Sequence, residues 1–276
     1  RNNYLTWLAV NILMGNRDTV NQNFALYQPN GSDKFYFLPW DYDGSFGFED
    51  QPDIKAANNL YAPWQLAASN WWGVPLHQRF MSDPKLLADL KAAVEEVYSK
   101  YLSSDKIKAK LDSYQALVAP FVAAAPDNTY LPAISSDKLK EWNDEYLRIA
   151  GVVKGNRDLF VSALEKPMPF WQAVELQGGE LRLAWDAAVD LQGDRVSYTV
   201  QLSGTPDFAV ILKEASVSTT EWLIAKPGNG IYYLKVTAKD SKGNTQQAFD
   251  RTDVGSKPYY GVYGFEVKTD AVTGLN

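Results

Sequence analysis

The spacing of the hydrophobic residues changes near residue 165, and this change predicts two parts of different architecture. Residues 3–14 are apolar on all sides of a helix, which is typical of a helix buried on most of its surface. Three later stretches have apolar residues at helical spacing, 84–101, 105–121 and 136–161, and each of these apolar faces is expected to belong to the core. Asp83 is expected to cap the first of them, with Pro84 at its first position. Four stretches beyond them alternate between apolar and polar residues, as strands do: 181–185, 196–202, 221–224 and 231–238.

A short hairpin is predicted directly after the first helix. Residues 24–27 and 34–38 have the composition of two strands, and residues 28–33 that of the turn between them. Gly15 suits the end of the preceding helix, because glycine enters the left-handed region without a Cβ penalty. This order of helix, turn, hairpin and turn is expected to place residues 15–23 and residues 39–44 at neighbouring ends of the hairpin.

The clearest boundary lies at residues 165–169, where two prolines in three positions exclude a helix and favour an extended spacer. We therefore expect a multidomain chain. Its first domain, residues 1–165, is mainly α with a small β-hairpin, and a linker follows over 166–170. Residues 171–251 are expected to form an all-β sandwich, since many short alternating strands separated by turns are typical of that fold. Residues 252–276 are a tail or the start of a further module.

Composition narrows the possible functions. The chain has 276 residues, 46% of them hydrophobic and 22% charged, as in soluble globular proteins. Its net charge of −6 argues against a nucleic-acid partner, which requires a clustered basic face. The absence of cysteine excludes disulfides, thiolate metal sites and cysteine nucleophiles, and His77, the single histidine, is interpreted as structural. No apolar run approaches the roughly 20 residues of a membrane span.

The two turns that flank the hairpin carry the candidate chemistry. Asn23 follows Asp18 by five positions, which is the Asp-to-Asn spacing of a protein-kinase catalytic loop. Asp41 ends the second strand and opens a glycine-containing turn, where a kinase has its metal-binding aspartate. Asp18 is then the base that orients the attacking hydroxyl, while Asn23 and Asp41 hold the metal and Asp43 is a second candidate ligand. Because aspartate and asparagine also form ordinary turns, the prediction depends on both turns occurring together.

Residues 7–18, Asn23 and the segment PWDYDGSFG at 39–47 resemble the CotH (spore-coat protein H) kinase family, and the resemblance continues to about Leu164. It implies an atypical protein-kinase-like fold, of which residues 1–165 would be the C-lobe. It also implies transfer of the ATP γ-phosphate, with Mg²⁺ or Mn²⁺, to a serine hydroxyl of a secreted or coat protein. By position, the base of the family falls on Asp18 and its metal ligands on Asn23 and Asp41. A secreted or cell-surface bacterial protein is the expected context.

The sequence also departs from classical kinases. Asn16 and Val20 stand where those enzymes have the histidine before Arg-Asp and the lysine after it. The glycine-rich loop and the strand lysine of an N-lobe are missing. Arg1 enters a helical pattern directly, which indicates a fragment of a longer polypeptide. We therefore expect this chain alone to be inactive or nearly so.

The second half resembles a fibronectin type III-like domain in Trp185, Tyr198, Tyr232 and the turn from Asp190 to Asp194. Asp190 and Asp194 are interpreted as turn formers, with Ca²⁺ binding as the alternative. Function does not follow from such a module. The alternative to a kinase is thus a non-catalytic surface protein, with a degenerate kinase-like scaffold and a β-sandwich that binds a polysaccharide or a cell-surface protein. A third hypothesis makes the turn Asp41–Asp43 a structural Ca²⁺ site.

Overall fold

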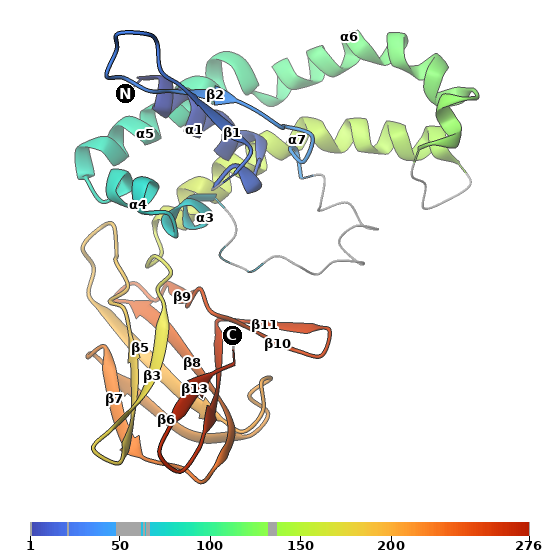
Figure 1. Cartoon of the computed structure of the whole chain (residues 1–276). Coiled ribbons are helices and arrows are strands. Elements are labelled where there is room, and N and C mark those ends of the chain that lie inside the picture. Colours follow the sequence, from blue (N-terminus) through green and yellow to red (C-terminus); the bar gives the residue numbers. More distant parts are fainter. Residues whose placement is uncertain are drawn as a thin grey trace. The chain divides into compact units, whose positions relative to one another are not determined.

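The computed structural model describes residues 2–20, 22–47, 62, 64, 67–131 and 137–275, and of Asp18 it describes only the backbone. The chain forms two compact units, both drawn in Figure 1. The first, called the helical unit, comprises residues 1–59 and 79–161, and the second, called the β unit, comprises residues 60–78 and 162–276. The expected order, a mainly helical part followed by a larger antiparallel β part, is what the structure has.

The helical unit contains one hairpin and a series of helices. Its elements in chain order are α1 (Asn2–Met14), the 3₁₀ turn η1 (Asp18–Val20), β1 (Phe24–Tyr27), β2 (Tyr36–Pro39), α5 (Pro84–Val97), the π-helical turn η3 (Tyr98–Leu102), α6 (Ser104–Ala123), the 3₁₀ turn η4 (Asp127–Thr129) and α7 (Lys138–Leu164). The last three residues of α7 lie in the β unit. Helix α4 (Pro75–Met81) spans the boundary of the two units at Gln78 and Arg79, and α3 (Ala67–Trp72) belongs to the β unit.

Helix α1 forms the core of the helical unit. Eight of its residues are buried, on all sides of the helix, which confirms the prediction from its apolar pattern: Tyr4, Leu5, Trp7, Leu8, Ala9, Asn11, Ile12 and Leu13. The ring of Phe37 from β2 lies 4.5 Å from that of Trp7 and 5.3 Å from that of Tyr4, measured between centroids. Asn3 accepts a hydrogen bond from the backbone N–H of Phe37 and donates one to its carbonyl, so α1 also fixes the position of β2.

Helix α5 begins as its sequence predicts. Asp83 caps it by accepting hydrogen bonds from the backbone N–H groups of Lys85 and Leu86, and Pro84 follows at the first helical position, where a missing N–H costs nothing. The buried residues of α5 recur at helical spacing on one face: Leu87, Leu90, Val94 and Val97. This buried face of α5 packs against α1 in the core of the helical unit.

Helix α6 differs from the prediction. Its apolar stripe was expected to be a core face, but only Val122 is buried among its residues. Four large apolar residues of the stripe are exposed instead: Tyr114, Leu117, Val118 and Phe121. Gln115, beside this stripe, donates a hydrogen bond to Asn143 of α7. Helical spacing of apolar residues defines a face, but it does not specify what covers that face.

The β unit contains two antiparallel sheets and a separate hairpin. Its strands are β3 (Gln172–Gln177), β4 (Glu180–Trp185), β5 (Val196–Ser203), β6 (Ile211–Val217), β7 (Glu221–Ala225), β8 (Gly230–Asp240), β9 (Thr245–Gln247), β10 (Arg251–Val254), β11 (Lys257–Tyr260), β12 (Val262–Val267) and β13 (Val272–Gly274). One sheet has the order β3-β4-β7, and the other has β13-β12-β8-β5-β6 with β9 paired to β8. Strands β10 and β11 pair only with each other.

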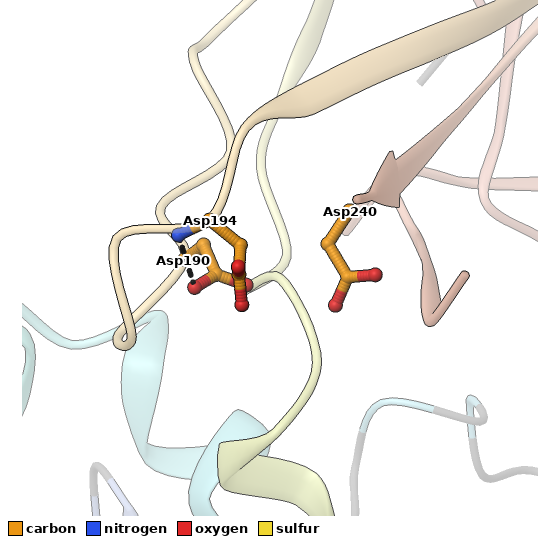
Figure 2. Close-up of side chains that lie close together, drawn as sticks. All are labelled: Asp190, Asp194 and Asp240. Atoms are coloured by element: carbon orange, nitrogen blue, oxygen red, sulfur yellow. Dashed lines mark hydrogen bonds between the residues drawn. The ribbon is translucent and has the colours of Figure 1, made fainter. Parts of the chain in front are cut away.

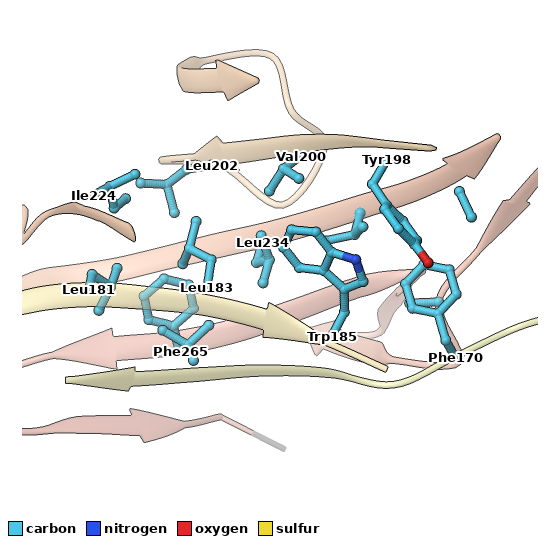
Figure 3. Packing of buried hydrophobic residues seen from close by; sticks show 14 of the residues in the cluster. Phe170, Leu181, Leu183, Trp185, Tyr198, Val200, Leu202, Ile224, Leu234 and Phe265 are labelled. Carbon is cyan, nitrogen blue, oxygen red and sulfur yellow. The ribbon is translucent and has the colours of Figure 1, made fainter. Parts of the chain in front are cut away.

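The inner faces of these two sheets share one hydrophobic core, shown in Figure 3. Trp185 from β4 lies against Tyr198 from β5, with ring centroids 5.4 Å apart. Leu234 from β8 and Phe265 from β12 are completely buried between the sheets. The four stretches predicted to alternate are thus strands of the two sheets, and each contributes alternate side chains to this core. The closer assignment to a fibronectin type III-like domain remains a prediction.

The β part extends beyond both ends of the predicted sandwich, residues 171–251. In the predicted linker, residues 166–170, the side chains of Met168 and Phe170 are buried, and Met168 donates its backbone N–H to Val189. The linker residues thus pack against the β unit and are not a free spacer. Residues 252–276, predicted as a tail or a new module, supply β12, which pairs with β8 over six residue pairs within the larger sheet.

Candidate functional site

The β1–β2 hairpin brings two polar segments to one of its ends. In the antiparallel register Phe24 pairs with Pro39, so Asn23, which precedes β1, and Asp41, which follows β2, are at the same end of the hairpin. Asn23 and Asp41 both have left-handed backbone conformations, with φ of 55° and 54°. Asparagine and aspartate adopt this region more readily than other residues with a Cβ atom, so the local backbone selects these residue types.

The end of helix α1 is closed by Gly15, as predicted. Gly15 has a φ of 67° and donates its backbone N–H to the carbonyl of Ile12. A Cβ atom at this position would lie 2.8 Å from Nδ2 of Asn156, too close for ordinary contact. That Nδ2 atom donates a hydrogen bond to the carbonyl of Leu13, so the last turn of α1 is capped by a side chain of α7. The glycine leaves room for this cap.

Asn16 connects the end of α1 to both polar segments. Its side chain is 0% exposed and donates a hydrogen bond of 3.2 Å from Nδ2 to the carbonyl oxygen of Asp41. Its own carbonyl accepts a hydrogen bond from Oγ1 of Thr19, within η1. The 3₁₀ turn that contains Asp18 is therefore linked through one buried asparagine to the backbone of Asp41. Oδ1 of Asn16 has no hydrogen-bond partner among the residues that the structure describes.

The segment from Asp41 to Gly47 is a compact turn. Ser45, which is buried, donates its backbone N–H to the carbonyl of Tyr42 at 3.1 Å. Burial raises the pKa of the Tyr42 phenol, and the neighbouring side chain of Asn11 opposes part of that rise. Asp43 is exposed and accepts the N–H of Gly44 at 2.9 Å, as a turn-forming aspartate does.

The predicted site residues are thus placed as follows. Asp18 lies in η1, and its side chain is outside the described part of the structure. Asn23 is partly buried, whereas Asp41 and Asp43 are exposed. The last three offer an amide oxygen and two carboxylates, the hard oxygen donors that Mg²⁺ prefers when one or two carboxylates and substrate phosphates complete its shell. This donor set fits a magnesium ion.

Two contacts of the site, both made by the backbone of Phe46, escaped the sequence analysis. Phe46 has a left-handed φ of 60°, and its backbone N–H donates to the carbonyl of Met14 at 2.6 Å. Its carbonyl accepts a hydrogen bond of 2.8 Å from Nη2 of Arg148, 102 positions later in the chain. Asn16, by contrast, could be singled out from the sequence, because it stands two positions before Asp18, where classical kinases have a histidine. For Arg148, one of several basic residues on a long helix, the sequence has no such signal.

A hollow in the surface lies beside this site. Its volume is about 410 Å³, and it is lined by Asn3, Thr6, Trp7, Val10, Phe37, Pro39 and Tyr42. Both amide atoms of Asn3 are engaged by the backbone of Phe37, so the lining is largely apolar. The hairpin also exposes large side chains: Leu26, Tyr27, Phe35, Tyr36, Leu38 and Trp40.

The β unit has a cluster of three aspartates, Asp190, Asp194 and Asp240, shown in Figure 2. One carboxylate oxygen of each lies within 4.8 Å of those of the other two. Oδ1 of Asp190 accepts the N–H groups of Gln192 and Asp194, which confirms that Asp190 forms a turn. Ca²⁺ binding was the alternative for Asp190 and Asp194.

The charges of this cluster are engaged by protein groups. Nζ of Lys242 lies 2.7 Å from Oδ2 of Asp194. Asp240 accepts backbone N–H groups of Lys242 and Asn244 and the side-chain amide of Asn244. Burial works against ionisation of Asp240, but the hydrogen bonds from Asn244 and from the backbone outweigh it and keep its pKa below the usual range. The three aspartates therefore have structural roles, in the turn that begins at Asp190 and in the turn that begins at Asp240, which Lys242 and Asp194 connect.

The remaining candidates have structural roles. His77 is buried, and its ring lies edge-on to Trp71 with 5.1 Å between centroids. Trp71 and Trp72 are almost completely buried, so these two large aromatic side chains are core residues. Trp64 packs edge-on against Phe249 within the β unit. No helix in the described part of the chain is long and apolar enough to cross a membrane.

Comparison with known proteins gives two matches. Inner spore coat protein H of Bacillus subtilis (strain 168) is 24% identical over 123 residues, which are 45% of this chain. The matched region is 32% of that relative, so this chain spans about a third of its length. The model of the family described as CotH kinase protein matches residues 1–159, which include all the residues of the site at the hairpin. Because this match covers more than half of the 276 residues, the chain belongs to the CotH kinase protein family.

Proposed function

We propose that this chain carries the metal- and hydroxyl-binding part of a protein kinase, which transfers the γ-phosphate of ATP to a serine hydroxyl of a protein. The observation that carries the proposal is the hydrogen bond from Asn16 to the carbonyl of Asp41. It joins the segment with Asp18 to the segment with Asp41 at the end of the hairpin where Asn23 also lies. Membership of the CotH kinase protein family supports the same reaction.

Each residue then has a role that follows from its chemistry. Asp18 accepts a hydrogen bond from the attacking hydroxyl and orients its oxygen toward the phosphate, as the base in a kinase catalytic loop does. Asn23 and Asp41 hold a divalent cation through their side-chain oxygens, and Asp43 is an additional ligand. When bound, Mg²⁺ or Mn²⁺ neutralises charge on the phosphates of ATP. Residues 1–165 would be the C-lobe of an atypical kinase-like fold.

The partner and location are inferred from the family and from the relative. A protein with accessible serine hydroxyls is the proposed substrate. A secreted or cell-surface location in a bacterium is proposed because the curated relative is an inner spore coat protein of Bacillus subtilis. The 276 residues alone are expected to turn over little or not at all, since no glycine-rich loop or strand lysine is among them.

Phosphotransfer from γ-labelled ATP is the test. The complete protein that carries this chain is incubated with Mg²⁺ and co-expressed surface proteins, beside its Asp18→Asn and Asp41→Ala variants. Both substitutions should abolish transfer, because each removes a part worth orders of magnitude in rate. Asp33→Asn is the matched control, an exposed aspartate in the loop at the opposite end of the same hairpin. Transfer that survives in Asp18→Asn and Asp41→Ala would contradict the assigned roles.

Absence of transfer by the folded, complete protein would favour the alternative. In it the helical unit is a non-catalytic scaffold, and the β unit binds a polysaccharide or another surface protein. Measurements of metal binding distinguish the kinase and scaffold hypotheses from the third hypothesis, in which Asp41–Asp43 form a structural Ca²⁺ site. A Ca²⁺ site binds without nucleotide, whereas the proposed kinase site binds Mg²⁺ weakly until ATP is present.

A further inference from the structure

The turn from Asp41 to Gly47 has a strained backbone at both ends. Asp41 and Phe46 are left-handed, with φ of 54° and 60°. For a bulky residue such as Phe46 this conformation is strained and persists only where surrounding contacts enforce it. Turns of this kind are common where a backbone must hold functional groups in one arrangement.

The contacts that enforce each end are different. At the first end, Asn16 holds the carbonyl of Asp41. At the second end, the peptide groups on both sides of Phe46 are held, since its N–H donates to Met14 and its carbonyl accepts from Arg148. Met14 and Asn16 both belong to the end of α1 and its cap. Arg148 lies outside that region, on α7.

Arg148 is itself fixed in orientation. Glu145, one turn earlier on α7, accepts from Nε at 2.7 Å and from Nη2 at 2.5 Å, so the guanidinium plane is held by two charge-assisted hydrogen bonds. The pair is only about 30% exposed, with side-chain values of 30% and 27%. A fixed, planar donor directs its remaining N–H groups in fixed directions, which a flexible lysine does not do.

A second contact joins the same helix to the same end of α1. Asn156 of α7 donates to the carbonyl of Leu13 at 3.0 Å. Asn156 follows Arg148 by eight positions, which is two steps of four along one face of a helix. One face of α7 therefore contacts the end of α1 through Asn156 and the turn through Arg148.

We propose that Arg148 is a positioning residue for the Asp41–Gly47 turn, which it holds through the carbonyl of Phe46 so that Asp41 and Asp43 stay in the arrangement that binds the cation. The part of this inference that concerns a cation bound by Asp41 and Asp43 rests on the proposed function. Its structural part, the coupling of α7 to the turn, stands on the contacts alone. Arg148 acts through the turn and does not itself touch substrate or metal.

Arg148→Gln tests this inference, and Arg157→Gln is its matched control. Arg157 lies on the same helix and also forms two hydrogen bonds with a glutamate, Glu95, but no contact recorded for Arg157 involves the turn. Arg148→Lys is the conservative variant, which keeps a cationic donor and loses the two-point orientation by Glu145. The same chain is used throughout, and circular dichroism establishes that each variant is folded.

Two measurements compare the variants without any enzymatic assay. Amide hydrogen exchange at Phe46 should be about tenfold faster in Arg148→Gln than in Arg157→Gln, because the charged donor that holds the following peptide group, through the Phe46 carbonyl, is gone and the turn opens more often. Mn²⁺ titrated with ATP and followed by electron paramagnetic resonance should bind several-fold more weakly. Arg148→Lys should fall between wild type and Arg148→Gln in both.

The outcomes are distinct. Equal exchange at Phe46 and equal Mn²⁺ affinity in Arg148→Gln and Arg157→Gln would overturn the inference. Should Arg148→Gln not fold, Glu145→Gln takes its place, since it leaves Arg148 present but unoriented, and it must raise the exchange rate at Phe46. Failure of the kinase proposal would be seen in a different experiment, as absence of phosphotransfer by the wild-type complete protein. It would not change the expected exchange rates at Phe46.

Discussion

The side-chain amide of Asn16 donates a hydrogen bond to the carbonyl oxygen of Asp41, and the whole β1–β2 hairpin lies between these two residues in the sequence. The acceptor is a backbone atom, so this contact fixes the path of the chain at Asp41 and does not involve its carboxylate. Because the side chain of Asn16 is completely buried, its donor group has no access to water. The contact makes one local structure out of two segments that are separate in the sequence.

Asn16→Ala should separate the two segments. It removes the donor and leaves the carbonyl of Asp41 without this partner, at an expected cost of about 1–3 kcal/mol in the free energy of unfolding of the helical unit. The loss of the helical far-ultraviolet signal in urea measures this cost. Asn30→Ala, in the exposed loop of the same hairpin, is the control and should change stability by less than about 0.5 kcal/mol. Equal effects of the two variants would contradict the role assigned to Asn16.

Gly15→Ala and Gly151→Ala should act in opposite directions. Gly15 has a φ of 67°, and an added Cβ atom would lie 2.8 Å from the amide nitrogen of Asn156 that caps α1, so alanine should destabilise the fold by about 1–2 kcal/mol. Gly151 lies within α7, where nothing is within 4 Å of an added Cβ atom, and alanine should stabilise by up to about 1 kcal/mol. Thermal unfolding of the two variants, monitored by circular dichroism, measures both effects. A stabilised Gly15→Ala variant would show that Asn156 does not cap α1.

The fold was predictable from the sequence wherever local patterns determine the structure. The all-round apolar helix α1, the capping Asp83, the C-cap Gly15 and the hairpin depend on residues within a few positions of each other. The inward side chains of the β unit follow from the period of two. Short-range chemistry was enough for these elements.

The remaining features depend on contacts between distant residues. The hydrogen bond from Arg148 to Phe46 spans 102 positions, and one arginine on a polar helix gives no sign of it. Burial of Met168 and Phe170 in the predicted linker depends on contacts within the β unit, which two prolines do not reveal. The family resemblance supplied the roles of Asp18, Asn23 and Asp41, and these roles remain predictions.

The uncovered face of α6 gives a prediction about stability. Leu117 and Phe121 are 65% and 61% exposed, whereas the neighbouring Val122 is 5% exposed. Leu117→Ser and Phe121→Ser should each change the free energy of unfolding by less than about 0.5 kcal/mol, because surface substitutions remove few contacts. Val122→Ser should cost about 2 kcal/mol or more, from lost burial and a buried hydroxyl. Chemical denaturation of the monomeric chain measures all three.

A large cost at Phe121 would show that α6 is covered in solution. The comparison with Val122, one position along the same helix, controls for helix propensity, since both positions receive the same serine. A cost at Phe121 that depends on protein concentration would identify the cover as a second copy of the chain.

Asp250 should make the β unit more stable at mildly acidic pH than at neutral pH. It is 5% exposed, and burial raises its pKa from 3.8 to about 6, with hydrogen bonds from Gln172 opposing that rise and the charge of Asp186 adding to it. The folded state therefore binds this proton more tightly than the unfolded state does. The stabilisation is complete below the unfolded pKa near 3.8 and is lost as the pH rises through about 6. Two pKa units correspond to about 3 kcal/mol as an upper limit.

Asp250→Asn isolates this effect. Oδ2 of Asp250 accepts both the backbone N–H and the side-chain amide of Gln172, and the amide oxygen of asparagine can accept the same two hydrogen bonds. The variant should match wild type near pH 4 and exceed its stability at pH 7.5, when both are unfolded in urea with tryptophan fluorescence as the signal. Asp253→Asn, at an exposed position of β10, is the control for loss of a surface charge. A difference between Asp250→Asn and wild type that stays constant from pH 4 to pH 7.5 would show that the pKa of Asp250 is the same in the folded and unfolded states, with the hydrogen bonds from Gln172 compensating fully for its burial.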